Sequence, residues 1–202
     1  MASAETLFKQ LLTDKKFLGF LAKFLLSFCI LYYGTIAIIG ITSPGGYYSA
    51  FADEYLDYVA ALRWLLLHSS KGLLELLGFD IYLKDIYTIK LQNGSGVHVG
   101  YDCIGYGVMA FWAAFVFANP LSFRRKSIWM LGGLLLIFVI NVIRICLMLV
   151  AVNQHWKSPF NLDNHTWFNI AAYIAIFTMM WFFDRAQKRN QLESENKSAI
   201  VY

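Results

Sequence analysis

Cys103 is the residue of this chain best placed for nucleophilic chemistry, because it opens an apolar stretch directly after Asp102. A thiol at the start of a helix lies near unpaired backbone N–H groups and the positive end of the helix dipole, which favour the nucleophilic thiolate. The carboxylate of Asp102 opposes this effect unless it is turned away or paired. The alternative is that Cys103 is a small packing residue, as lone cysteines usually are.

Arg144 is a charged residue inside an otherwise apolar stretch. It lies about seventeen residues, or roughly 25 Å of helix, beyond the start of that stretch. An arginine inside a membrane helix costs about 2.5–3.5 kcal/mol on insertion scales and marks a functional site by default. Asn141, three residues earlier, shares its helix face and is placed to orient the guanidinium or extend a polar pocket. The alternative is a snorkelling side chain or a structural ion pair.

His165 precedes the last apolar stretch of the chain. An imidazole titrates near neutral pH, so a histidine here suits a general base. The alternative is an interfacial histidine without a role, and His98 and His155 are rival candidates for the base. The chain has three cysteines and four histidines, but no CxxC pair and no clustered spacing. We therefore expect no metal site and no cofactor.

The composition indicates that lipid surrounds much of the chain, since 58% of its 202 residues are hydrophobic and only 15% are charged. A soluble domain is less apolar and carries more charge. Four segments approach the roughly 20 apolar residues that a transmembrane helix needs. They are residues 20–41, 103–120, 127–150 and 166–183. The first apolar run is too long for a signal peptide, so we expect a retained anchor.

The distribution of charge predicts the orientation of these spans. With the N-terminus inside, the inner segments carry eleven Lys and Arg residues against five acids, and the outer segments carry five against eight. This bias fits the positive-inside rule, so the net charge of +4 reflects topology and does not indicate nucleic-acid binding. Both termini are then cytoplasmic, and Cys103, Arg144 and His165 all lie at the outer ends of their spans.

The outer segment, residues 42–102, contains a further apolar stretch from Tyr55 to Leu77 and an alternating pattern around Asn93-Gly94. We expect the first to be an amphipathic helix at the outer surface, because a spanning helix would invert everything after it. The second predicts a short β-hairpin leading into Cys103. The predicted fold is one all-α polytopic membrane domain over residues 1–202, with about four transmembrane helices, this surface helix and the hairpin; a fifth span is the alternative.

Two short boxes carry a resemblance to a known family. Asp102-Cys103-Ile104-Gly105 and Asn141-Val142-Ile143-Arg144-Ile145, followed by a histidine that opens a final helix, resemble the exosortase/archaeosortase family. The similarity extends over roughly residues 55 to 183, including the step Leu77-Gly78 and the hairpin. The chain departs from many members at Ile104, where they have Ser or Thr, which bears on substrate preference more than on catalysis. Its length is similar to that of the compact bacterial forms.

The resemblance implies a catalytic triad in which Cys103 is the nucleophile, Arg144 the arginine and His165 the histidine. The residues expected to support the site or bind substrate are Asn141, Asp102 and Gly105. Family members are membrane cysteine proteases and transpeptidases, functionally analogous to sortases though unrelated in fold. The implied substrates are exported proteins with a C-terminal motif, a transmembrane helix and a basic tail, cleaved at the outer face of a bacterial inner membrane.

Two other functional classes remain open from the residues alone. A non-catalytic membrane scaffold or assembly subunit would keep Arg144 as a structural pair and leave Cys103 inert. A small-molecule transporter would usually show repeated halves and polar residues near mid-membrane, and no internal repeat is visible.

Overall fold

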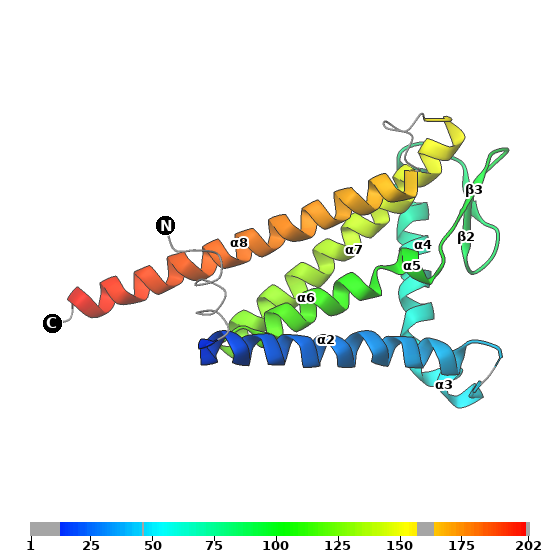
Figure 1. The fold of residues 1–202 in the computed structure, drawn as a ribbon. Coiled ribbons are helices and arrows are strands. Elements are labelled where there is room, and N and C mark those ends of the chain that lie inside the picture. Colours follow the sequence, from blue (N-terminus) through cyan, green and yellow to red (C-terminus); the bar gives the residue numbers. More distant parts are fainter. Residues whose placement is uncertain (1–12, 46, 157–163, 201–202) are drawn as a thin grey trace. The chain divides into compact units, whose positions relative to one another are not determined.

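The computed structural model describes residues 13–45, 47–156 and 164–200, without the side chains of residues 164, 165, 168, 172 and 190–200. The chain is mostly helical, with one small sheet (Figure 1). It divides into two compact units, Met1–Leu149 and Val150–Tyr202.

In the first unit, α2 (Lys15–Thr42) packs along α6 (Tyr106–Ala118) through aromatic rings. Phe20, Phe24, Phe28 and Tyr32 follow one another at intervals of four residues, so they form a single ridge on α2. The ring of Phe24 meets that of Phe111 edge to face at 5.2 Å between centroids. This geometry favours aromatic pairs beyond the area they bury. The ridge therefore fixes α6, which begins just after Cys103, against α2.

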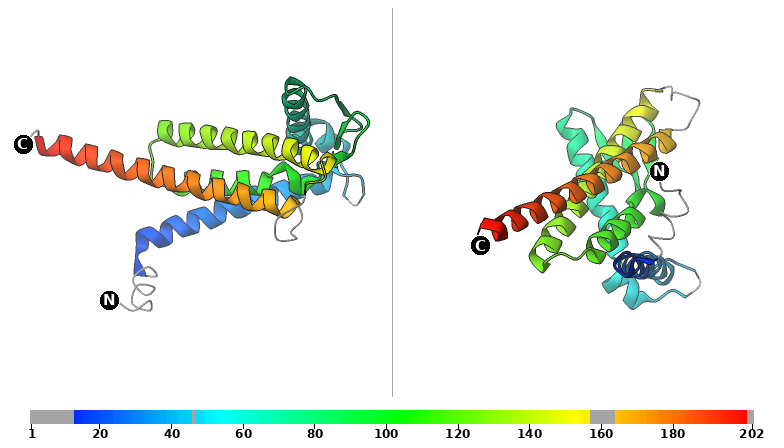
Figure 2. Two further views of the ribbon diagram at one scale, coloured as in Figure 1. Left: turned by 90° about the horizontal axis from the view of Figure 1, so that it is seen from above. Right: turned by 60° about the vertical axis from the view of Figure 1, so that its left-hand side comes forward.

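Two helices follow α2 in the predicted outer segment. A short helix, α3 (Ala50–Leu56), is followed by α4 (Tyr58–Leu76), whose first turn is capped because the Asp57 carboxylate accepts the Ala60 N–H at 2.8 Å. The views agree that α4 crosses the end of the α2–α6 pair that also carries the cysteine turn (Figures 1 and 2). A helix in this position fits the predicted surface helix.

The two faces of α4 differ as an amphipathic helix requires. On its exposed face the His68 ring stacks on Trp64 at 4.0 Å, and the Lys71 ammonium lies 3.6 Å from the Glu75 carboxylate. The amphipathic character predicted for this stretch is confirmed. The opposite face is buried and comprises Val59, Arg63, Leu66, Leu67, Ser70 and Leu74.

The predicted hairpin is present, and a third strand precedes it. The antiparallel sheet has the order β1 (Ile81–Leu83), β2 (Thr88–Leu91), β3 (Gly96–His98). Ile89 lies opposite Val97 on one side and Leu83 on the other, and both Ile89 and Val97 are buried. Contacts of β1 and β2 with α4 place the sheet beside this helix. The sequence does not reveal β1, because three residues are too few for an alternating pattern.

The connection between β2 and β3 is longer than two residues and contains Asn93 at φ 60°. Asparagine tolerates this left-handed conformation better than most residues. After β3 the ladder continues to Val99, whose N–H donates to the Tyr87 carbonyl at 2.7 Å. The extended conformation ends before Tyr101, which begins a helix.

The expected continuous helix over 103–120 is interrupted. A single turn, α5 (Tyr101–Ile104), ends at Gly105, which has φ 80°, and α6 starts afresh at Tyr106. Glycine adopts this left-handed conformation readily, and it is the usual residue just past a helix end. At its far end α6 ends at Ala118, directly before Asn119-Pro120 and two residues short of the predicted end of the span.

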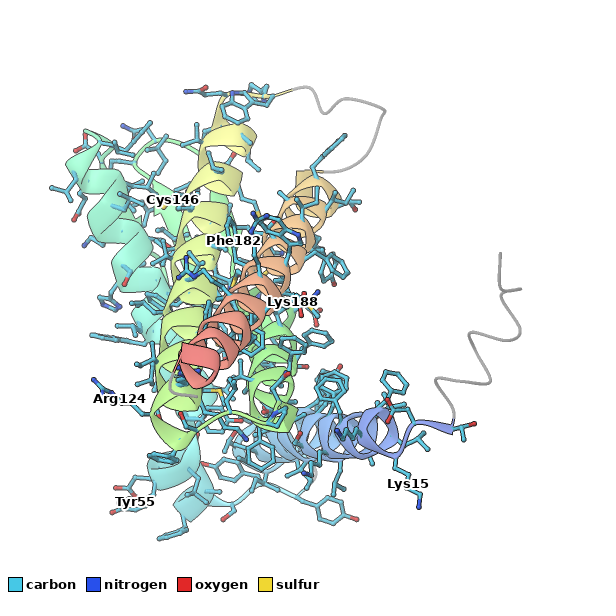
Figure 3. All side chains as sticks on the ribbon, turned by 90° about the vertical axis from the view of Figure 1, so that its left-hand side faces the viewer. Lys15, Tyr55, Arg124, Cys146, Phe182 and Lys188 are labelled. Atoms are coloured by element: carbon cyan, nitrogen blue, oxygen red, sulfur yellow. The ribbon has the colours of Figure 1, made fainter. Side chains whose placement is uncertain are left out.

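Helix α7 (Phe123–Asn153) packs against α6 at a glycine. The Trp112 indole N–H donates to the Trp129 carbonyl at 3.1 Å, and a Cβ at Gly133 would overlap the Trp112 ring. Farther along, the Cys146 thiol donates to the Ser70 carbonyl of α4 at 3.6 Å, so Cys146 lies on the α4 side of α7 (Figure 3). The contacts of α7 thus run from α6 at one end to α4 at the other.

The second unit consists mainly of α8 (Asn164–Ile200), which contains the predicted last span. The predicted span ends at residue 183, but the helix continues beyond it through polar residues. The Asp184 carboxylate pairs with the Lys188 ammonium at 2.8 Å one turn on, and neither Gly nor Pro interrupts the segment. In α8 the apolar part therefore ends well before the helix itself ends.

Among the described residues, two helices are long and apolar enough to cross a membrane, α2 and α7, while α6 is apolar but shorter. These two helices fit the predicted membrane protein, and the count of four spans stays a prediction.

Candidate functional site

Cys103 lies in the one-turn helix α5, between the sheet and α6. Its N–H donates to the Gly100 carbonyl at 3.0 Å, and its side chain is half-buried. The expectation that it opens a membrane helix is wrong, because Gly105 separates it from α6. A single turn carries little of the dipole that a long helix accumulates. The position of Cys103 is set instead by the turns on either side of it.

Asp102 is exposed, next to Cys103. Its carboxylate is therefore hydrated, and water screens its charge more than a buried site would. Asp102 is adjacent to the candidate nucleophile, at the edge of the site.

Asn141 joins α7 to the cysteine turn. Its side-chain amide donates to the Ile104 carbonyl at 3.0 Å in a buried hydrogen bond. The acceptor belongs to the residue directly after Cys103, at the C-terminal end of α5, where carbonyls lack helical partners. The bond therefore satisfies a buried backbone group and fixes the cysteine turn to α7.

Gly105 makes that bond possible in two ways. Its φ of 80° lets the chain turn from α5 into α6. In addition, a Cβ at this position would overlap the Asn141 amide nitrogen. Of the expected supporting residues, Asn141 and Gly105 are thus in direct contact with the turn that holds Cys103.

Arg144 is 7% exposed and lies one helical turn beyond Asn141 on α7. Two residues later, Cys146 contacts Ser70 of α4. Along α7, Arg144 therefore lies between Asn141, which contacts the cysteine turn, and Cys146, which contacts α4. A guanidinium in this position supplies a positive charge in a largely apolar interior, where electrostatic interactions are stronger than in water.

His165 is the second residue of α8, in the second unit, and its side chain lies outside the described residues. Its approach to Cys103 stays a prediction. Of the rival histidines, His98 is exposed on β3, with its Nδ1 3.4 Å from the Thr88 hydroxyl and its ring 5.6 Å from that of Tyr87. His155 is exposed and has φ 50°.

Arg63 is a second buried arginine near the cysteine turn, and the sequence did not point to it as part of the site. It is 3% exposed, and its Cζ lies 4.3 Å from the ring centroid of Tyr87 and 4.6 Å from that of Tyr101. Tyr101 belongs to α5, two residues before Cys103. A signal was present: Arg63 follows Val59 by four residues, so it falls on the apolar face of the amphipathic helix.

Comparison with known proteins adds one match. The family model described as transmembrane exosortase matches residues 17–182. No curated protein and no solved structure matches the chain.

Proposed function

The chain belongs to the transmembrane exosortase family, and from this membership we propose that it is a membrane cysteine transpeptidase or protease with Cys103 as nucleophile. The observation that carries the proposal is the hydrogen bond from Asn141 to the Ile104 carbonyl. It joins the two sequence boxes, one with the cysteine and one with the arginine, at a single buried contact.

In the proposed reaction, the Cys103 thiolate attacks a peptide carbonyl carbon of the substrate. The carbonyl oxygen becomes an oxyanion, which Arg144 stabilises; such stabilisation is strongest where water is excluded. The C–N bond then breaks, and the leaving amine takes its proton from His165, which received it from the thiol. The product of this step is a thioester between Cys103 and the substrate's N-terminal part.

The thioester is resolved by a second nucleophile. Water gives hydrolysis, and an amine or hydroxyl acceptor gives transfer; either attacks the thioester carbonyl and releases the Cys103 thiolate. His165 takes the proton of the attacking group. Asn141 and Gly105 act as positioning residues, because they hold the cysteine turn against α7 without contacting the reacting atoms.

The proposed substrates are exported proteins with a short C-terminal recognition motif, one transmembrane helix and a basic tail. Cleavage occurs at the outer face of a bacterial inner membrane, where the charge distribution puts the outer ends of the predicted spans. Both termini of the enzyme are cytoplasmic in this topology.

The test is cleavage of a co-expressed membrane-anchored substrate chosen from the same genome by its motif, helix and basic tail. We expect Cys103→Ser, Arg144→Ala and His165→Ala each to abolish detectable cleavage while the protein remains in the membrane. Cys29→Ser is the matched control, because Cys29 is an exposed residue of α2 and should keep wild-type activity.

Retained cleavage in Cys103→Ser or Cys103→Ala would exclude the thioester scheme. Thiol labelling provides a substrate-independent measurement: a Cys103 that stays unreactive between pH 6 and 9 in the folded protein, but is labelled once the protein is denatured, would favour a non-catalytic scaffold.

A further inference from the structure

The chain folds back on α2 soon after that helix ends. The Ser49 N–H donates to the carbonyl of Ile41, in the last turn of α2, at 2.9 Å. Farther along, the Tyr58 hydroxyl lies 2.5 Å from the hydroxyl of Thr35. Thr35 precedes Ile41 by six residues, or about 9 Å of helix. The short helix α3, between these two contacts, therefore lies beside the last turns of α2 and not beyond its end (Figure 1).

Large aromatic side chains cover the exposed surface of this segment. Phe51 is 67% exposed and Tyr55 66%, and their rings lie 5.1 Å apart between centroids. Tyr47, just before α3, is 91% exposed. The buried residue of α3 is the small Ala52. Single exposed hydrophobic residues are ordinary, but a contiguous patch of them marks a surface that binds something.

The position of α3 indicates that lipid covers this patch. Helix α2 is long and apolar enough to cross a membrane, and little of its surface is buried in the protein. The C-terminal end of a crossing α2 is surrounded by headgroups and by the adjoining part of the acyl chains. A segment packed beside the last turns of α2 lies at the same depth. Aromatic residues are enriched at this level of a bilayer, because their rings are apolar and their polar atoms still reach water.

The charges of the segment separate this assignment from electrostatic binding. Residues 43–62 contain three acids and no Lys or Arg. A segment that binds anionic lipid through charge needs basic residues, so this one depends on its rings. Asp53 is two residues, or about 200° of helix, from both Phe51 and Tyr55. The aromatic pair therefore faces one side of α3, and Asp53, which accepts the Tyr48 hydroxyl at 2.9 Å, faces the other.

We propose that α3 is an interfacial anchor: Phe51 and Tyr55 insert at the boundary between headgroups and acyl chains, while Asp53 faces water. The leaflet is the outer one in the predicted topology. The inference goes beyond the proposed function, because it concerns lipid and holds whether or not Cys103 is a nucleophile. It requires only that α2 crosses the membrane. Since α4 starts at Tyr58, shortly after α3, the anchor also sets the depth of the first turn of α4.

The experiment measures the depth of single labelled positions in the full-length protein. Phe51→Cys and Tyr55→Cys are compared with the matched control Asp53→Cys. All three are made in a background of Cys29→Ser, Cys103→Ser and Cys146→Ala. Each is labelled with nitrobenzoxadiazole and placed in phosphatidylcholine nanodiscs, whose two faces are both open to solvent. The quenchers are iodide in the water and a phosphatidylcholine that carries a nitroxide near the top of its acyl chain.

We expect the lipid nitroxide to quench the dye at Phe51 and Tyr55 more strongly than the dye at Asp53, and iodide to show the opposite order. The two aromatic positions should lie roughly 5–10 Å into the boundary between headgroups and acyl chains. Their depth should not change in nanodiscs that also contain phosphatidylglycerol, because residues 43–62 have no basic side chain.

Three results would overturn the proposal. Equal iodide quenching at all three positions would put α3 in water. Protection of Phe51 and Tyr55 from both quenchers would mean that protein covers them, from a second copy or another chain. A depth that appears only with phosphatidylglycerol would replace the aromatic anchor by an electrostatic one.

A second measurement keeps the three cysteines. The photoreactive residue p-benzoylphenylalanine replaces Phe51 in the otherwise unchanged chain, and cell membranes that contain it are irradiated. We expect the chain to gain the mass of a phospholipid. The same replacement at Asp53 is the control and should give much less of this adduct. Crosslinks from position 51 to protein alone, or equal lipid adducts at the two positions, would reject the anchor.

Discussion

Gly105 is subject to two separate constraints at the junction between α5 and α6. Its backbone is left-handed, at φ 80°, and the Asn141 amide occupies the space that a Cβ would need. We expect Gly105→Ala to destabilise the protein by about 1–3 kcal/mol from backbone strain, with a further loss from the displaced amide. Thermal unfolding in detergent and substrate cleavage measure the two consequences.

Gly72→Ala is the control for that substitution. Gly72 lies inside α4, where an added Cβ would meet nothing within 4 Å, and its φ is not in the left-handed range. Alanine should be neutral or stabilise the helix by up to about 1 kcal/mol. Equal behaviour of the two variants would contradict the role assigned to Gly105.

Asn141→Leu tests the bond between α7 and the cysteine turn. Leucine keeps the approximate size of the side chain and removes the donor, so the buried Ile104 carbonyl loses its partner. We expect a loss of about 1–3 kcal/mol in unfolding free energy. We also expect kcat to fall more than KM changes, because the residue positions the nucleophile and does not bind substrate. Wild-type kcat in a variant that is destabilised would limit Asn141 to a structural role.

At the scale of residues, the sequence identified the types of side chain but not their contacts. Asn141 was expected to orient Arg144, whereas its amide donates to Ile104. Spacing along a helix shows which residues share a face, but a contact between helices depends on packing that the spacing does not contain. From the sequence, the charge of Arg63 mainly argues against membrane insertion of its segment. Its spacing from Val59 nevertheless places it on the apolar face of the predicted helix.

Two adjacent glycines of α7 test how this helix packs on α6. A Cβ at Gly133 would overlap the Trp112 indole, while one at Gly132 would meet nothing within 4 Å. We expect Gly133→Ala to cost about 1–3 kcal/mol through overpacking. Gly132→Ala should be neutral or slightly stabilising. The thermal midpoints of the two variants, measured side by side, show which glycine packs against Trp112. A destabilised Gly132→Ala would show that the contact is assigned to the wrong glycine.

The turn before β2 provides a prediction about pH. The Asp85 carboxylate accepts the Tyr87 N–H at 2.7 Å, and this hydrogen bond holds the pKa of Asp85 below its ordinary value of 3.8. A lowered carboxylate pKa means that the stabilisation is present above the ordinary value and is lost as pH falls through the folded-state pKa. Protection of the Tyr87 amide from hydrogen exchange should therefore be constant from neutral pH to about 4 and decline below it.

Asp85→Asn is the matched control, because its amide oxygen still accepts the Tyr87 N–H but does not titrate. Its protection, corrected for intrinsic exchange, should stay flat with pH. A parallel decline in wild type and variant would assign the pH dependence to another group.

At the scale of elements, long periodic segments were predicted well and short ones were not. The amphipathic face of α4 and the hairpin around Asn93 follow from repeated patterns over many residues. The break at Gly105 and the three-residue strand β1 do not, because one left-handed residue or three strand residues produce no periodic signal. The glycine between Ile104 and Tyr106 was nevertheless a local sign of a helix end.

The arrangement of the first unit bears on the topology of the whole molecule. Helix α4 crosses the ends of α2 and α6 instead of running beside them, as expected for a helix at a membrane surface (Figures 1 and 2). The charge distribution predicts that this end lies outside. The packing of α4 and the distribution of Lys and Arg are independent features of the chain.

Helix α6 is the weakest point of this topology. Its 13 residues extend about 20 Å, whereas the hydrocarbon layer is about 30 Å thick. A helix this short crosses only with help from local thinning of the bilayer or from flanking residues. If it crosses, Gln92 in the hairpin connection and Arg125 at the start of α7 lie on opposite sides of the membrane.

Single cysteines at these two exposed positions decide the matter, in a background of Cys29→Ser, Cys103→Ser and Cys146→Ala. In intact cells, we expect Gln92→Cys to react with a membrane-impermeant maleimide and Arg125→Cys to react only after permeabilisation. The reverse pattern would mean that α4 spans the membrane and the chain has five spans. Reaction of both cysteines from outside would mean that α6 does not cross the membrane. The predicted four-span topology, which places Cys103 at the outer end of a span, would then be wrong.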